Sequence, residues 1–197
     1  MAVTPLNELL LQALEHERGG VLVYETALRC AVNDDLGKEW QKYLEETKRH
    51  VQVLQEVCSV MNLDPNKQTP GTKIVHDLGA SLVAAMQAAL ATAGAPAAQL
   101  VACECVVLAE TKDHLNWELI GKASTTLKGA EAKALKAAYE EVEDQEDEHI
   151  YHTKGWCREL WIEALGMRAV LPPPEERKQV KTAIGAARAE QERGQMR

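Results

Sequence analysis

The chain has 197 residues, 46% hydrophobic and 26% charged, a size and composition typical of a folded globular protein with one sizeable core. Lys and Arg number 22 against 30 Asp and Glu, so the formal net charge is −8, and the absence of a basic cluster argues against a nucleic-acid partner. Aromatic residues make up only 4%, which disfavours a β-sandwich, whereas the abundance of Ala, Leu, Glu and Lys is typical of a helical bundle.

The N-terminal segment, residues 1–11, has neither a basic start nor an uninterrupted apolar run before Glu8. We therefore expect no signal peptide, no membrane partner and a cytoplasmic location. An odd number of cysteines is scattered through apolar helical stretches, which predicts buried, reduced thiols. They are Cys30, Cys58, Cys103, Cys105 and Cys157.

Apolar residues at helical spacing predict a first helix that begins at Thr4-Pro5, an N-cap followed by a proline, and ends at residues 33–35. A second helix is expected over about residues 36–62, and the short connection makes it antiparallel to the first. An Ala-rich segment over about 73–93, ending at Gly94-Ala95-Pro96, is expected to form a crossover helix.

A third long helix is predicted over about 97–122 and a fourth over about 130–165, after a turn at 127–129. Two antiparallel pairs joined by a long crossover predict an all-α fold, an antiparallel four-helix bundle, over residues 1–168. Residues 169–197 are predicted to be a Pro-rich linker and a charged helical arm, mobile or docked, whose thin apolar stripe is too small for its own core. That stripe consists of Val180, Ile184 and Ala187.

Each predicted bundle helix has an inward seam, the row of positions three and four residues apart that faces the core, and each seam contains a carboxylate. In the fourth helix the seam contains Glu146 and His149, which we prefer to Glu148 and His152 on a more polar stripe. Residues at these spacings share one helix face and can hold a metal together. The seam is Leu135, Tyr139, Val142, Glu146, His149, Thr153, Trp156 and Leu160.

The third helix places Glu110 and His114 in its seam, and the second places Glu46 and His50 there. In the first helix, the stripe through Leu14, Val21, Leu28 and Val32 leaves Glu25 as the buried carboxylate. Other candidates near inward stripes, as alternative or outer ligands or as solvated groups, are Glu17 and Glu104.

The four seam carboxylates are expected at one depth, because residues equally distant from an antiparallel turn lie level with each other. Glu25 and Glu46 are centred on the turn at residues 33–37, and Glu110 and Glu146 on residue 128. Burying four carboxylates without compensation would cost several kcal/mol each, against a typical net stability of about 5 to 15 kcal/mol. Divalent cations or protons must therefore balance them.

One Glu from each of two helices, with a Glu and a nearby His from each of the other two, resembles the ferritin-like di-iron carboxylate superfamily. Within it, the small rubrerythrin-like and bacterioferritin-like bundles are the most similar, over about residues 5–165. The resemblance implies that two iron ions are bound, with manganese or zinc as alternatives. Its implied ligands are Glu25, Glu46, His50, Glu110, Glu146 and His149, and His114 is a seventh candidate.

Proteins of this kind handle Fe(II) with oxygen or peroxide, so the resemblance implies an oxidase, peroxidase or ferroxidase. The chain has no Cys-x-x-Cys pair for a rubredoxin-type centre, so peroxide turnover would need an external electron donor. The alternative is a non-catalytic metal-buffering or helical interaction module in stress response. A homodimer is expected, through an apolar face that includes Ala85, Leu90, Trp161 and Leu165.

Overall fold

The computed structural model describes residues 4–174 and 179–196, which form six helices and no strand. The prediction of an all-α protein is confirmed, and each predicted helix is present with ends shifted by a few residues. The helices are α1 (Pro5–Cys30), α2 (Asp34–Val60), α3 (Pro70–Thr92), α4 (Ala95–Thr126), α5 (Gly129–Ala164) and α6 (Gln179–Gln195).

Side-chain caps fix where the first three helices begin. The Thr4 hydroxyl accepts a hydrogen bond from the backbone N–H of Asn7, and Asn33 accepts from the first turn of α2. Thr69 and Thr72 form a reciprocal capping box at the start of α3. These caps satisfy backbone donors that the helices leave unpaired, so the turns between helices are set locally.

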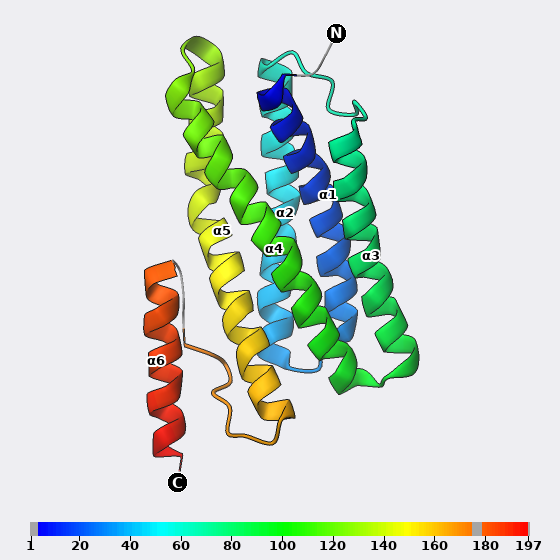
Figure 1. The fold of residues 1–197 in the computed structure, drawn as a ribbon, viewed down its shortest axis with the longest axis vertical. Helices are drawn as coiled ribbons and strands as arrows, with labels where there is room; N and C mark the ends of the chain where they lie inside the picture. The colour runs from blue at the N-terminus through cyan, green and yellow to red at the C-terminus, as the bar shows by residue number, and fades with distance from the viewer. Residues whose placement is uncertain (1–3, 175–178, 197) are drawn as a thin grey trace.

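The first five helices lie side by side and alternate in direction, with α1, α3 and α5 running opposite to α2 and α4 (Figure 1). α1 packs against α2, α3 and α4, while α5 packs against α2, α4 and α6. Within the described residues, neither α1 with α5 nor α2 with α4 forms a packed pair. α3 lies alongside α1 and contacts α1 and α4 (Figure 1).

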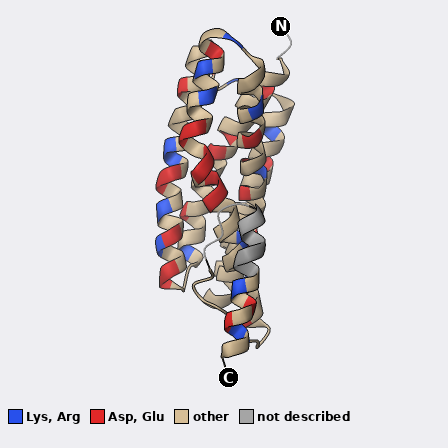
Figure 2. Ribbon diagram, turned by 90° about the vertical axis from the view of Figure 1, so that its left-hand side faces the viewer, with Lys and Arg blue, Asp and Glu red and all other residues tan. Residues whose placement is uncertain are grey.

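The apolar core consists of two clusters along the length of the helices rather than one. One cluster includes Val23, Trp40 and Trp156, and the other includes Leu14, Leu54 and Leu135. In the sequences of α1, α2, α4 and α5, buried polar residues separate the two sets, and Figure 2 shows Asp and Glu in the middle of the helices as well as toward their ends. The fold therefore holds a polar layer between two apolar clusters.

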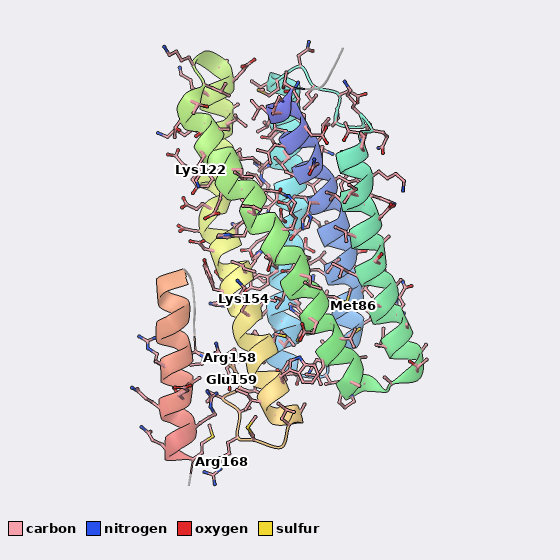
Figure 3. All side chains as sticks on the ribbon, in the orientation of Figure 1. Met86, Lys122, Lys154, Arg158, Glu159 and Arg168 are labelled. Atoms are coloured by element: carbon pink, nitrogen blue, oxygen red, sulfur yellow. The ribbon has the colours of Figure 1, made fainter. Side chains whose placement is uncertain are left out.

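α6 lies beside the lower part of α5, where the labelled Arg158 and Glu159 are found (Figure 3). The fully buried Glu159 carboxylate accepts hydrogen bonds from Arg193 of α6 at 2.7 and 2.6 Å and from the Val170 N–H at 2.9 Å. In the predicted apolar stripe of the arm, Ala187 is exposed, while the side chains of Val180 and Ile184 lie outside the described residues.

The remaining sequence predictions about the surface and thiols have mixed outcomes. All five cysteines are buried and free, as predicted. Ala85, Trp161 and Leu165 of the expected dimer face are exposed, and the homodimer itself stays a prediction. Among the described helices, α3 alone has the length and apolar composition of a membrane-spanning segment, and most of that segment lies outside the core.

Candidate metal centre

The first of two buried triads in the polar layer joins α1, α2 and α5. Glu17, His50 and Glu146 each place a potential ligand atom within 4.8 Å of the other two, and all three are buried. The Nδ1 atom of His50 lies 3.1 Å from Glu146 Oε1 and 3.4 Å from Glu17 Oε1. Three helices thus direct two carboxylates and an imidazole to one point.

The second triad joins α4 and α5 and shares Glu146 with the first. Glu110, Glu146 and His149 place their potential ligand atoms within 4.8 Å of each other, and all three are buried. His149 Nδ1 lies 3.6 Å from Glu110 Oε2 and 3.6 Å from Glu146 Oε1. Because Glu146 belongs to both triads, the two potential ion positions are neighbours.

Hydrogen bonds to residues outside the triads orient both imidazoles. His50 Nε2 lies 2.7 Å from the Gln145 amide oxygen, and His149 Nε2 lies 2.9 Å from a Glu46 carboxylate oxygen. These oxygens accept hydrogen bonds, so Nε2 carries the proton in each ring and Nδ1 of the neutral ring presents its lone pair to the triads. A second nitrogen held in this way fixes both the tautomer and the orientation of a metal-binding histidine.

Two aromatic side chains each hold one oxygen of a triad carboxylate. Tyr24 donates its hydroxyl hydrogen to Glu110 Oε1 at 2.8 Å, and Trp117 donates its ring N–H to Glu17 Oε1 at 2.7 Å. The second oxygen of each carboxylate has no hydrogen-bond partner, and neither oxygen of Glu146 has one. Buried polar atoms without partners are costly, so these converging oxygens match an ion-binding role.

Charge in the layer perturbs the ordinary ionisation of its members. Burial would lower the pKa of His149, but the Glu110 and Glu46 carboxylates outweigh it and raise that pKa to about 9. Burial raises the pKa of Glu146, and repulsion from Glu110 adds to the rise against the opposing effect of the nearby His50 imidazole. Protons on the imidazoles therefore balance the carboxylates when no cation is present.

Asp113 of α4 adds a further buried carboxyl to the layer. Burial, followed by repulsion from Glu17, Glu146 and Glu110, raises the pKa of Asp113 well above its usual range. The side chain is only 4% exposed, and its Oδ1 atom has no hydrogen-bond partner. This rise favours the neutral, protonated form of Asp113 and so limits the negative charge that it adds to the layer.

The structure brings together four of the seven residues predicted as ligands: His50, Glu110, Glu146 and His149. Glu46 is partly exposed and contacts His149 from outside the triads. His114 points away from the triads, with Nε2 2.9 Å from Asp147. The expectation that Glu25 is buried is wrong, because it is exposed and Glu17 occupies the interior position on α1.

Small residues explain the error on α1. The buried row of this helix passes through Ala13, Glu17, Gly20, Tyr24 and Ala27, where several positions have little or no side chain. A Cβ on Gly20 would lie 3.3 Å from the Thr47 methyl group, so close packing requires the small residue. The larger apolar residues that suggested the wrong row, Val21, Leu28 and Val32, lie at its edge or in solvent. The sequence signal for the correct interior row was that Glu17 and Tyr24 are seven residues apart and therefore lie on one helix face.

A polar cavity of about 240 Å³ between α4 and α5 reaches the layer from outside. His114, Glu118, Glu143 and Asp147 line its walls, and Glu146 also lies in its lining. This cavity is where the predicted ligand His114 is found. It connects solvent with the carboxylate that the two triads share.

Comparisons with known protein families, curated proteins and solved structures find no match for this chain.

Proposed function

We propose that this chain is a ferritin-like protein with a dinuclear metal centre, most suited to iron, that handles Fe(II) with oxygen or peroxide. The observation that carries the proposal is the pair of buried triads that share Glu146. Three carboxylates and two neutral imidazoles offset three of the four positive charges of two divalent ions. Mixed oxygen and nitrogen donors suit iron, manganese and zinc.

The helix arrangement supports a four-helix bundle of α1, α2, α4 and α5, with α3 as the crossover. Each of these helices packs against two others of the set, and the pairs α1 with α5 and α2 with α4 do not pack among the described residues. The two pairs that do not pack therefore lie diagonally across a bundle of four helices. Because α3 connects the end of α2 to the start of α4 and runs opposite to both, those two helices are parallel, as in ferritin-like topology.

Two iron ions held in this layer would supply the redox chemistry for reducing dioxygen or peroxide. The chain's own residues orient the donors: Glu46 and Gln145 fix the imidazoles, while Tyr24 and Trp117 fix the carboxylates. The raised pKa of Asp113 favours a proton held beside the carboxylates. The two apolar clusters exclude water from both ends of the layer.

The polar cavity supports a route for cations to the centre. Glu118, Glu143 and Asp147 line it, and Glu146 is reached through it. Negative side chains around an opening raise the local concentration of cations, which speeds their association. We expect Fe(II) to reach Glu146 along this side of α4 and α5.

The test is an anaerobic Fe(II) titration of the full chain, followed by measurement of oxygen and peroxide consumption. We expect two iron ions per chain and catalytic consumption of one of the two oxidants. Glu146→Gln should prevent the second ion from binding, because it removes the carboxylate shared by both triads. Glu148→Gln is the matched control, since this neighbouring carboxylate pairs with Lys42 outside the triads.

The outcomes separate the candidate functions. Two bound ions without oxidant consumption would favour the metal-buffering alternative over an oxidoreductase. No bound iron, or equal binding by wild type and Glu146→Gln, would reject a dinuclear centre at these triads.

A further inference from the structure

A second cavity, separate from the metal centre, lies between α1, α3 and α4 and has a volume of about 350 Å³. None of the five triad residues lines it. Its walls are mainly apolar, and α3 and α4 contribute exposed side chains to them: Ile74 (62% exposed), Leu78 (59%) and Leu108 (60%). Large apolar side chains exposed around a cavity indicate a binding site.

The cavity has a polar end and an apolar end. His16 of α1 lies opposite Ala109 of α4, since its Nε2 atom is 3.0 Å from the Ala109 carbonyl oxygen. The two helices run in opposite directions, so Gln12 and Lys112 lie on one side of this contact and Val23 lies on the other. The lining segment of α1 from Gln12 to Val23 spans about 16 Å, at 1.5 Å per residue.

Lys112 carries the fixed charge of the lining. Its ammonium group donates to the neutral Asn116 amide oxygen, and no carboxylate of the described chain lies within ion-pair distance of it. No Asp or Glu lines the cavity, although the whole chain has 30 of them. A partly buried ammonium without an anion is complementary to a ligand with one negative charge.

We propose that this cavity binds an amphipathic monocarboxylate, such as a medium-chain fatty acid. Its carboxylate would pair with Lys112, and its chain would lie against Val23, Leu78, Leu82 and Leu108 toward the apolar end. A single cation at the end of an elongated apolar cavity matches one charged head and one apolar tail. The proposal is independent of the metal centre, because the two sites share no residue.

The test compares decanoate with its neutral analogue decanol by isothermal titration calorimetry on the full chain. Wild type should bind one decanoate. Lys112→Met should bind decanoate at least about tenfold more weakly and bind decanol as wild type does, since only the charge-assisted contact is lost. Leu78→Glu should weaken both ligands at least about tenfold, because it puts a charge against the chain.

Leu115→Glu is the matched control for folding and surface charge. Leu115 is exposed on α4 like Leu108 but does not line the cavity, so this variant should bind both ligands as wild type does. Circular dichroism of every variant checks the helical fold, and Leu78→Glu should keep that fold because Leu78 is exposed.

Several results would overturn the proposal. The first is the absence of saturable decanoate binding by wild type, and the second is equal decanoate affinity of wild type and Lys112→Met. A wild-type dimer that Leu78→Glu dissociates, without decanoate binding, would assign the face to a second copy of the chain. Flotation with phosphatidylcholine vesicles that Leu78→Glu abolishes, again without decanoate binding, would assign it to a membrane surface.

Discussion

Replacing Glu17 by Gln tests whether α1 contributes to the metal centre through this residue. The amide keeps an oxygen for the hydrogen bond from Trp117 at 2.7 Å and removes only the charge. At an effective dielectric of about 20, a Glu146 oxygen within 4.8 Å repels Glu17 by at least about 3.5 kcal/mol, while protonated His50 at 3.4 Å attracts it by about 5 kcal/mol. These energies oppose each other, so the metal-free variant should melt within about 6 °C of wild type.

Metal binding should separate the variant from wild type. With free metal at about 1,000 times its Kd, binding adds about 4.1 kcal/mol of stability, which is about 8 to 16 °C in Tm for a chain of this size. A hundredfold loss of affinity would reduce this gain to about 1.4 kcal/mol, or about 3 to 6 °C. The measurement is the Tm of each protein in chelator and in anaerobic Fe(II).

Glu25→Gln provides the control, because it makes the same change of charge at an exposed position of the same helix. Its metal-induced rise in Tm should equal that of wild type. The reasoning is refuted if Glu17→Gln keeps the full rise or if Glu25→Gln loses it, since either result would place the α1 ligand at Glu25 or elsewhere.

Three further predictions follow from contacts around the centre and α6. Glu46→Gln should weaken metal binding about 10- to 100-fold without changing the number of ions bound, because it alters the hydrogen bond that orients His149; equilibrium titration measures both quantities. Arg193→Met should destabilise the chain by about 2 kcal/mol and expose α6 to proteolysis, because the buried Glu159 loses a charged partner. Denaturant unfolding and the rate of tryptic cleavage after Arg188 of the same helix test this, and an unchanged rate would contradict it. Burial would raise the pKa of Glu159, but hydrogen bonds from Arg193, Val170 and Arg158 outweigh it and lower that pKa. The stability difference between wild type and Arg193→Met should therefore be full above about pH 5 and vanish as the pH falls through the lowered pKa. A difference that grew in acid would contradict this assignment.

The helices and the α5 half of the centre could be predicted because strong local signals agree there. In α5 the seam is filled by large apolar residues, so Glu146 and His149 stand out as interior polar residues, and both are buried. The Thr4-Pro5 pair located the start of the first helix in the same way. Burial at such positions follows from the residue pattern within one helix, and this pattern can be read from a single sequence.

The interior residues of α1, α2 and α4 were predicted less accurately, because which residues face inward there depends on the neighbouring helices. On α2 the interior position is Thr47 rather than Glu46, and on α4 it is Asp113 rather than His114. In each case the polar residue chosen is one position from the buried residue, about 100° around the helix. Hydrophobicity cannot resolve this rotation where the interior residues are small or polar, and contacts such as Glu46 with His149 arise only after the helices assemble.

The division of the core into two clusters has a mechanical consequence for the layer between them. Each of α1, α2, α4 and α5 contributes apolar residues to both clusters, so every helix is anchored on both sides of the layer. A helix fixed at two points cannot rotate to turn Glu17, Glu110 or Glu146 toward solvent without breaking apolar contacts on one side. The repelling carboxylates are therefore kept at close range before any cation arrives, and an arriving ion meets donors that need little rearrangement.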